Sequence, residues 1–445
     1  MTSGADQVKP IQTSSRRGMV SVSLETSKRD EAFWQKQEKR RQGRLGQPCC
    51  TQSKMSWALI HMPGNFALVI HGEEDCLNCF HQHTGQSAGN VYSTRLTEYQ
   101  ITSGETQRPL KHLLHLIADQ KQPDAIIVLG TCPVEVIGDR FEIVVDQVSE
   151  ATGIPMTALH TSGLKLTRLV DMQDWLYATL ATLASGSQQQ VAGTINIIGL
   201  QDGVANHPEL REMVKDLGLT IGGIYPNGTS FSDWQRIGEA EKSFVVDASA
   251  FPRLTAHLES LGQEVLEVPL PIGLQQSRRF YKLIGDAVGK EKEVTTLLEE
   301  RSREASAEID AIRKELNGFP MAMAIRMLNT YRSDQLAYDG LGDFALLKEC
   351  GLRVALFVQG PPEEKPAFVE TLQERYGIQD PVEVFPGPWL LGERLREFGY
   401  RHAIAPDSCT ATLRQSGVAA IPSRTFPPFF AGVSAGVALI RRLLV

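Results

Sequence analysis

Short apolar runs alternate with amphipathic stretches from about residue 46 to the C-terminus. Unbroken apolar runs bounded by Gly, Pro or Asp are typical of buried parallel strands. Stretches with apolar positions three and four residues apart are typical of helices that cover such strands. On this basis strands are predicted at 66–70, 124–130, 154–161, 194–200, 220–226, 242–249, 264–273, 352–360, 382–387 and 402–408.

The helical pattern falls between these strands. It predicts helices at 108–120, 134–151, 207–219, 252–262, from 275, 290–317, 344–351, 365–377, 391–399 and 433–445. Regular alternation of strands and helices indicates an α/β protein, and its length favours three doubly wound, Rossmann-like parallel-sheet domains around a central crevice. We expect a polar extension at 1–45, α/β domains at 46–190 and 191–290, and a connector helix with a third domain at 291–445.

The composition is typical of a protein with several hydrophobic cores of common size. The chain has 445 residues, of which 42% are hydrophobic and 22% charged, which is typical of soluble globular domains. A net charge of -7 argues against a nucleic-acid partner. No apolar run has the length of a membrane span and the N-terminus lacks a secretion signal, so we expect a cytoplasmic protein without a membrane partner.

The cysteines are concentrated near predicted turns. Five of the seven lie in the first third of the chain: Cys49, Cys50, Cys76, Cys79 and Cys132. A disulfide framework is not expected in a large chain without an export signal, whereas metal or cluster ligation fits. The carboxyl ends of parallel strands meet at one edge of the sheet, so cysteines from separate turns can bind the same metal ion or cluster. Three turns supply thiols here: one carries Cys49 and Cys50, one Cys76 and one Cys132. Iron–sulfur clusters commonly have four thiolate ligands, so the fourth would come from Cys79 or from another subunit.

Two other kinds of site use Cys76 and Cys79. With His81 and His83 they have the ligand types of a zinc site, although the pairs are closer in sequence than in a zinc finger. A Cys-x-x-Cys pair is also typical of thioredoxin-like redox centres. Both alternatives leave Cys50 and Cys132 without a role. The preceding acids, residues 73–75, are expected to form a solvated turn, or else to tune a cluster's potential.

Three cysteine motifs resemble those of the nitrogenase component 1 family, the catalytic subunits of nitrogenase and nitrogenase-like reductases. They are GQPCC (46–50), VIHGEEDC (69–76) and IIVLGTCPVEVIGD (126–139). The resemblance implies that Cys50, Cys76 and Cys132 hold an interfacial [4Fe–4S] or P-cluster-like [8Fe–7S] cluster, with Cys49 and Cys79 as alternative ligands. It also implies that Ser162 lies close to the cluster.

The same resemblance implies partners. A homologous subunit would complete an α2β2-type assembly, an ATP-dependent iron protein would supply low-potential electrons, and a small molecule would be reduced. In the family's cofactor-holding subunit a cysteine and a histidine anchor the iron–molybdenum cofactor. Here Asp247 and either Phe429 or Phe430 stand near those positions. We therefore expect that this chain alone does not hold that cofactor.

Several roles remain open on the sequence. The leading interpretation is a β-type subunit of an ATP-dependent reductase that carries an electron-transfer cluster. The chain also resembles the N subunit of dark-operative protochlorophyllide reductase, which would make it a tetrapyrrole (protochlorophyllide or chlorophyllide) reductase subunit. A non-catalytic scaffold for nitrogenase-cofactor assembly and a metal-free binding protein are the further alternatives. The substrate, whether dinitrogen, a thioether or a tetrapyrrole, is left open.

Overall fold

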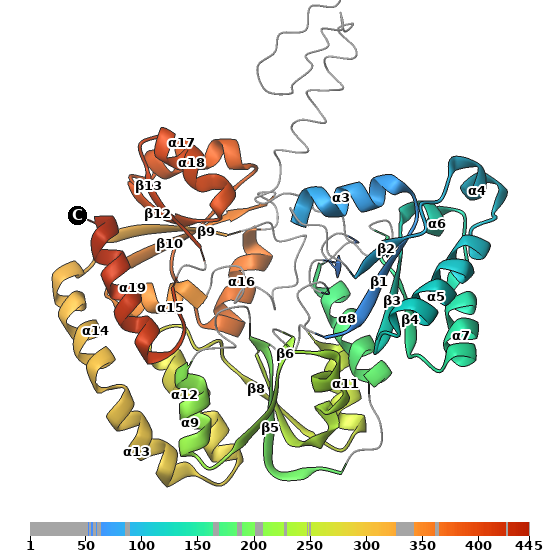
Figure 1. The fold of residues 1–445 in the computed structure, drawn as a ribbon. Coiled ribbons are helices and arrows are strands. Elements are labelled where there is room, and N and C mark those ends of the chain that lie inside the picture. The colour runs from blue at the N-terminus through green and yellow to red at the C-terminus, as the bar shows by residue number, and fades with distance from the viewer. Residues whose placement is uncertain are drawn as a thin grey trace, which may run out of the picture.

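The structure is a computed structural model. It describes residues 52, 55, 56, 59, 64–84, 90–162, 169–184, 189–200, 208–226, 229–246, 248, 251–325, 342–360, 365–423 and 426–444. In this part of the chain the strands form three sheets of four, four and five strands, and every ladder is parallel (Figure 1).

The first sheet positions the cysteine motifs. Its strand order is β2 (Val91–Ser93), β1 (Phe66–His71), β3 (Ala125–Gly130) and β4 (Met156–His160). All residues of β1 and β3 are buried, because helices cover both faces of this sheet. One face packs on α5 (Gln107–Lys121) and α7 (Phe141–Thr152), and the other packs on α8 (Leu169–Ala184).

The second and third sheets follow in chain order. The second has the order β6 (Thr220–Pro226), β5 (Val191–Leu200), β7 (Ala240–Val246) and β8 (Glu264–Val268). The third has the order β11 (Val382–Phe385), β10 (Arg353–Gln359), β9 (Pro320–Ile325), β12 (His402–Ala405) and β13 (Ala419–Pro422). The predicted fold class, α/β with several doubly wound parallel sheets, is confirmed. The domain boundaries stay a prediction.

Helices pack around these two sheets, and some of them contribute to apolar clusters that include residues of more than one sheet. Their bounds are α9 (Pro208–Asp216), α10 (Phe231–Gln235), α11 (Pro252–Ser260), α12 (Leu274–Ala287), α15 (Gly342–Glu349), α16 (Lys365–Tyr376), α17 (Pro388–Glu397), α18 (Asp407–Gln415) and α19 (Phe429–Leu444). One apolar cluster joins the second and third sheets, and another joins the first and second. The three units therefore share core contacts.

The helix predicted at 134–151 is wrong as a single element. The structure has a short helix, α6 (Cys132–Val136), and then α7. Gly138 lies between them in the left-handed region at φ 70°, a conformation that glycine adopts at little cost. The chain turns there, and Asp139 follows the turn outside both helices.

The predicted connector helix at 290–317 is also wrong as a single element. It is divided into α13 (Glu291–Arg301) and α14 (Arg303–Leu316), which run along one side of the molecule (Figure 1). Buried Ser302 marks the joint. Its hydroxyl donates to the Leu298 carbonyl at 2.5 Å and accepts from the Arg278 guanidinium at 2.7 Å. Such side-chain bonds to the preceding turn favour a bend.

The apolar pattern misses three of the described strands, β2, β9 and the four-residue edge strand β13. β2 has only three residues, and its sequence, VYS, is surrounded by polar residues. β9, PMAMAI, is the central strand of the third sheet although Ala and Met have little preference for strands. Within the described residues, no helix combines the length and the hydrophobicity that crossing a membrane requires.

Candidate functional site

Three of the predicted site residues follow adjacent strands of the first sheet. β1 and β3 end in register, His71 opposite Gly130, and β4 ends with His160 opposite the same glycine. Cys76, Cys132 and Ser162 come within five residues of these strand ends. The structure therefore brings all three segments to one edge of the sheet, which we call the cysteine edge.

Cys76 lies in a helix and not in the expected loop. Helix α3 runs from Glu74 to Thr84, and Cys76 is its third residue. The Cys76 N–H donates to the Glu73 carbonyl at 3.2 Å and so tightens the first turn. Glu74 and Asp75 are exposed in this turn, where carboxylates interact favourably with the positive end of the helix dipole. The acids thus have a structural explanation: they favour the start of the helix that carries Cys76.

Cys132 opens α6 directly after Thr131, and it is half-buried like Cys76. The Thr131 N–H and hydroxyl both donate to the His71 carbonyl, at 3.1 Å and 2.9 Å. Gly72 packs closely on the same threonine, because a Cβ on this glycine would lie 2.0 Å from Thr131 Oγ1. The turns that lead to Cys76 and Cys132 are therefore joined by two hydrogen bonds and a close contact.

Ser162 is positioned by a second threonine in the same way. The Thr161 N–H and hydroxyl donate to the Gly130 carbonyl, at 2.9 Å and 2.7 Å. Ser162 is fully buried behind this junction. The same arrangement thus occurs twice: Thr131 after β3 donates to the last carbonyl of β1, and Thr161 after β4 donates to the last carbonyl of β3.

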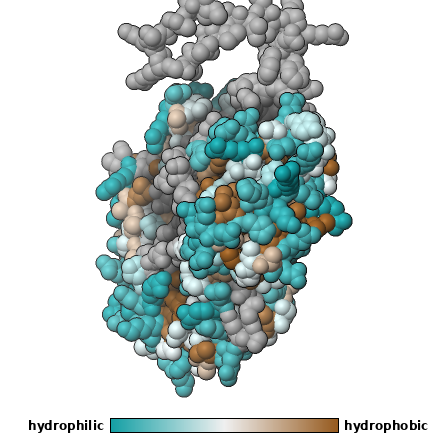
Figure 2. Space-filling view, turned by 45° about the vertical axis from the view of Figure 1, so that its right-hand side comes forward, coloured by the Kyte–Doolittle hydropathy of each residue, from teal (hydrophilic) through white to brown (hydrophobic). Residues whose placement is uncertain are grey.

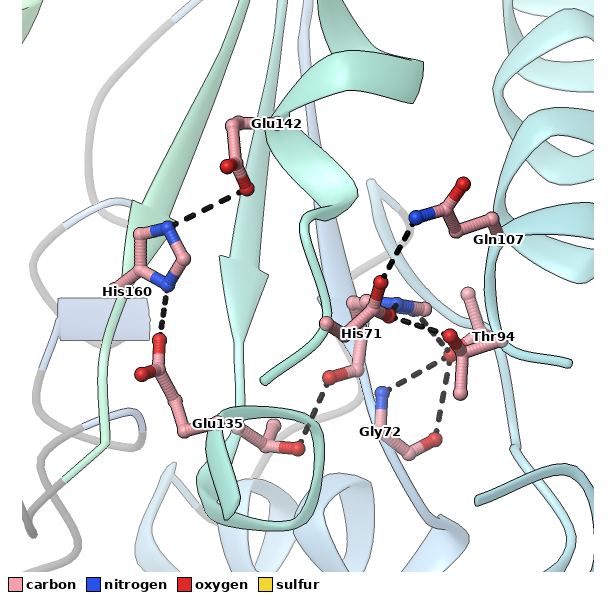
Figure 3. Close-up of polar contacts among 10 residues, drawn as sticks. His71, Gly72, Thr94, Gln107, Glu135, Glu142 and His160 are labelled. Carbon is pink, nitrogen blue, oxygen red and sulfur yellow. Dashed lines mark hydrogen bonds and ion pairs between the residues drawn. The ribbon is translucent and has the colours of Figure 1, made fainter. Parts of the chain in front are cut away.

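A buried histidine–aspartate pair lies at the end of β1, close to the cysteine edge, and Figure 3 shows the polar contacts around its histidine. His71 Nε2 is 3.1 Å from Asp139 Oδ2, and Nδ1 is 3.2 Å from Thr94 Oγ1. Asp139 also accepts from the Thr106 hydroxyl at 2.5 Å and from Gln107 at 3.2 Å. Burial raises the pKa of Asp139, but these hydrogen bonds and the His71 charge outweigh it, and the pKa is lowered. Asp139 is therefore a carboxylate that these hydrogen bonds stabilise.

A second histidine lies between two carboxylates. His160 Nδ1 contacts Glu135 of α6, and Nε2 is 3.7 Å from Glu142 of α7 (Figure 3). Glu135 is buried, so an imidazole partner offsets part of its desolvation. The ring of Phe141 packs against both histidines. Its centroid is 4.7 Å from the ring centroid of His160 and 5.3 Å from that of His71. The segment after Cys132 is thereby held to the ends of β1 and β4.

The sequence interpretation gave no role to either of these histidines. A signal was present, because each is the last residue of a strand and precedes a Gly-containing turn. Glu135 and Asp139 brace the segment after Cys132, and their histidine partners are 25 and 68 residues away in sequence.

Of the remaining predicted residues, the structure describes Cys79 and the two C-terminal phenylalanines. Cys49, Cys50 and Asp247 lie outside the described residues. Cys79 is half-buried in α3, one turn after Cys76. Among the described side chains, no group of three or more His, Cys, Asp or Glu could hold a metal ion. Cys76 and Cys132 are the thiols that this part of the chain brings from separate strands to the cysteine edge.

The C-terminal phenylalanines are core residues. Phe429 and Phe430 are buried at the start of α19, with ring centroids 5.5 Å and 6.0 Å from that of Tyr281. Cys350 is also buried, and burial raises the pKa of its thiol to about 12. It therefore stays a thiol at neutral pH and is a core residue.

Comparison with known proteins identifies relatives. The sequence model of the family described as nitrogenase component 1 type oxidoreductase matches residues 50–328, more than half of the chain. The nitrogenase molybdenum-iron protein beta chain of Acidithiobacillus ferridurans is 22% identical over 276 residues, which cover 55% of this chain and 52% of that protein. The nitrogenase iron-molybdenum cofactor biosynthesis protein NifE of Sinorhizobium fredii is 24% identical over 170 residues, 38% of this chain and 34% of that protein.

The fold is similar to that of solved structures as well. A structure titled "Nitrogenase Cp1 at pH 5" has a TM-score of 0.67 at 16% identity and covers 85% of each chain. At this identity the similarity concerns the fold. In sequence, the matched part of the chain spans between a third and about half of the length of the curated relatives named above.

Proposed function

Since this chain belongs to the nitrogenase component 1 type oxidoreductase family, we propose that it is a subunit of the catalytic component of an ATP-dependent, nitrogenase-like reductase. In this role its cysteine edge would hold an iron–sulfur cluster between this chain and a homologous partner. A separate iron protein would supply electrons, and a small-molecule substrate would be reduced at a site that the two subunits share.

The observation that carries this proposal is the joining of the Cys76 and Cys132 turns. Two half-buried thiols leave adjacent strand ends, and the Thr131–His71 hydrogen bonds tie those ends together. Thiolates are the ligands that iron–sulfur clusters use in proteins, so the donors fit the expected group. Cys50, Cys76 and Cys132 would be the ligands, with Cys49 or Cys79 as alternatives and Ser162 close by. When bound, such a cluster stores and releases single electrons at low potential.

The protein around these thiols would serve two purposes. The Thr131 and Thr161 hydrogen bonds hold the ligand-bearing turns in place before a cluster binds, which lowers the entropic cost of binding it. Burial of the strand ends excludes water from one side of the site, and the half-exposed thiols leave the other side open for a partner.

The surface next to Cys132 supports a protein partner. Val136 and Ile137 follow this cysteine and are 71% and 39% exposed. The face of the molecule that Figure 2 shows is mainly hydrophilic, with apolar residues scattered over it. Two adjacent exposed apolar side chains beside a proposed ligand offer a partner protein apolar area to bury next to the site. The partner subunit or the iron protein would cover them here.

A scaffold role is the second candidate function. NifE proteins, whose name assigns them to cofactor biosynthesis, are among the relatives of this chain. A scaffold would use the same cysteine edge to hold a metallocluster and hand it on. The tetrapyrrole reductase alternative rests on the sequence resemblance alone.

Cluster binding can be tested by metal analysis. The full chain is produced without oxygen, together with its homologous partner subunit, and iron and acid-labile sulfide are measured. We expect both in the wild type and a loss of both in the Cys76→Ser/Cys132→Ser double variant. Cys350→Ala, a change in a buried thiol of another unit, is the matched control and should retain them. Normal iron and sulfide in the double variant would falsify the proposal.

Turnover separates the two candidate functions. With the iron protein, ATP and a reductant, a catalytic subunit pair reduces its substrate continuously. A scaffold binds the iron protein and keeps its cluster but shows no continuous reduction with dinitrogen, a thioether or protochlorophyllide.

A further inference from the structure

We propose that Cys76 and Cys79 form a reversible disulfide within α3 in the chain that lacks its cluster. The pair would be a redox-controlled site: in the dithiol state Cys76 is available as a ligand, and in the disulfide state it is not. The bond itself is a property of the helix, and its effect on cluster loading rests on the proposed function.

The helix geometry brings the two thiols together. Cys76 and Cys79 are the third and sixth residues of α3, so they lie on the same face of the helix. Cβ atoms three residues apart in a helix are about 5–6 Å apart. A disulfide requires a Cα separation of about 4.4–6.8 Å and a Cβ separation of about 3.5–4.5 Å. The pair therefore needs an approach of about 1–2 Å between its Cβ atoms.

The first turn of α3 can supply this approach. The N–H bond from Cys76 to the Glu73 carbonyl gives the turn just before the pair the pattern of a tighter 3₁₀ turn, and the same tightening one turn later would bring Cys76 and Cys79 together. In 3₁₀ geometry, side chains three residues apart lie above one another. Side chains of a helix also point toward its N-terminus, so the Cys79 side chain leans toward the turn that carries Cys76.

The rest of the helix stays attached to the sheet while this turn adjusts. Leu77 and Phe80 are buried against Ile70 of β1, and Cys76 packs at the rim of this small cluster. Both cysteines are half-buried, so a small oxidant reaches them without unfolding the helix. Cys350 and Cys409 are buried and differ in this respect.

The reaction with a small-molecule disulfide balances without other reagents. The thiolate of one cysteine attacks a sulfur of the small disulfide, which forms a mixed disulfide and releases one small thiolate. The second cysteine, as its thiolate, then attacks the protein sulfur and releases the second small thiol. The two protein thiols are oxidised by two electrons, the small disulfide is reduced to two thiols, and the two protons pass to these products.

Tryptic peptides make the test selective. Cleavage after Lys54 and Arg95 places Cys76 and Cys79 on one peptide, 55–95. Cys49 and Cys50 lie on peptide 45–54, Cys132 on 122–140 and Cys350 on 349–353. A Cys76–Cys79 bond therefore appears as one peptide that is lighter by two hydrogens. A bond from Cys76 to Cys50 or Cys132 would join two peptides.

The experiment uses the full-length chain stripped of iron by a chelator without oxygen. The chain is equilibrated with oxidised and reduced glutathione, alkylated, digested and examined by mass spectrometry. We expect both thiols of peptide 55–95 to be lost together, and to return with dithiothreitol. The Cys79→Ser variant should instead carry a glutathione adduct on Cys76, and the Cys350 peptide should stay a thiol throughout. Cross-linked peptides, or two independent glutathione adducts on peptide 55–95, would overturn the proposal.

The consequence for loading is measured separately. The oxidised chain, together with its homologous partner subunit, is offered iron and sulfide, and iron content and the cluster's absorption are recorded before and after dithiothreitol is added. We expect no loading before reduction and loading after it. If the disulfide forms but the reduced chain takes up no iron, the proposed function fails and the dithiol inference stands. If the oxidised chain loads as well as the reduced one, the redox control is refuted.

Discussion

His71 and Asp139 lie 68 residues apart in sequence, yet their side chains meet close to the cysteine edge with 3.1 Å between Nε2 and Oδ2. Both are almost fully buried. The pair connects the end of β1, whose turn leads to Cys76, with the turn that follows Cys132. Since buried charged groups need hydrogen-bonded partners, this pair constrains both ligand-bearing turns at once.

The first prediction concerns the Asp139 carboxylate. Asp139→Asn replaces an acceptor oxygen with an NH2 group that faces the donors of His71, Thr106 or Gln107. We expect the free energy of unfolding to fall by about 2–3 kcal/mol, since hydrogen bonds to a charged group are lost. Urea unfolding measures this. Asp119→Asn, on the exposed surface of α5, is the control and should change stability by no more than about 0.5 kcal/mol. Equal effects of the two variants would contradict the assigned role.

The second prediction concerns the pH dependence of the same group. The pKa of Asp139 is lower in the folded protein than in the unfolded chain, so the unfolded state binds more protons in acid. The stabilisation is fully present above the unfolded value of about 3.9 and is lost as the pH falls through the folded pKa. The stability difference between wild type and Asp139→Asn should therefore shrink below about pH 4. Urea midpoints of both proteins from about pH 3 to pH 7 test this, and a difference that widens in acid would refute it.

Local sequence signals predicted the strands that build the cysteine edge. The runs FALVI and AIIVLG are apolar throughout because both faces of the first sheet are covered, and this pattern is legible without a structure. Placing the cysteine turns at one edge needed only the rule that parallel strands end together. The start of α3 was missed although its signal was present, since Glu74 and Asp75 are residues that favour a helix's first turn.

Other features depend on contacts that local patterns do not contain. Gly138 interrupts a stretch whose apolar spacing continues across it, so the break between α6 and α7 was not evident. The partners of Asp139 and Glu135 come from distant strand ends, and no spacing within the motif specifies them. β9 is a strand because its neighbours on both sides pair with it, which overrides the weak strand preference of its residues.

The third prediction concerns the contact between Gly72 and Thr131. A methyl group at Gly72 would lie 2.0 Å from Thr131 Oγ1 and 2.9 Å from its Cβ. Gly72→Ala should therefore push the two turns apart and lower stability by about 1–3 kcal/mol. In a Thr131→Ala background the hydroxyl is absent but the Cβ remains, so the added cost of Gly72→Ala should be smaller. A double-mutant cycle on urea unfolding measures the coupling, and strictly additive effects would show that the contact is unimportant.

Carboxylates also join the three units to one another. Each of three acids accepts N–H groups at the start of a helix distant in sequence. Asp174 of α8 binds the start of α11, Glu349 of α15 that of α12, and Glu209 of α9 that of α19. The first N–H groups of a helix lack partners within it, and a carboxylate also complements the helix dipole. These contacts therefore contribute to the packing of one unit on the next.

The fourth prediction tests the Glu349 contact at α12. Its two carboxylate oxygens accept from the Leu274 and Gln275 N–H groups at 2.6 Å and 2.8 Å. Glu349→Ala leaves both donors without this partner and should lower the free energy of unfolding by about 1–3 kcal/mol. Glu349→Gln keeps one acceptor oxygen and should cost less. Glu300→Ala, an exposed glutamate on α13, controls for the loss of charge and should have little effect on the urea midpoint. If Glu349→Gln were as destabilising as Glu349→Ala, the negative charge and not the pair of hydrogen bonds would be what holds α12 to α15.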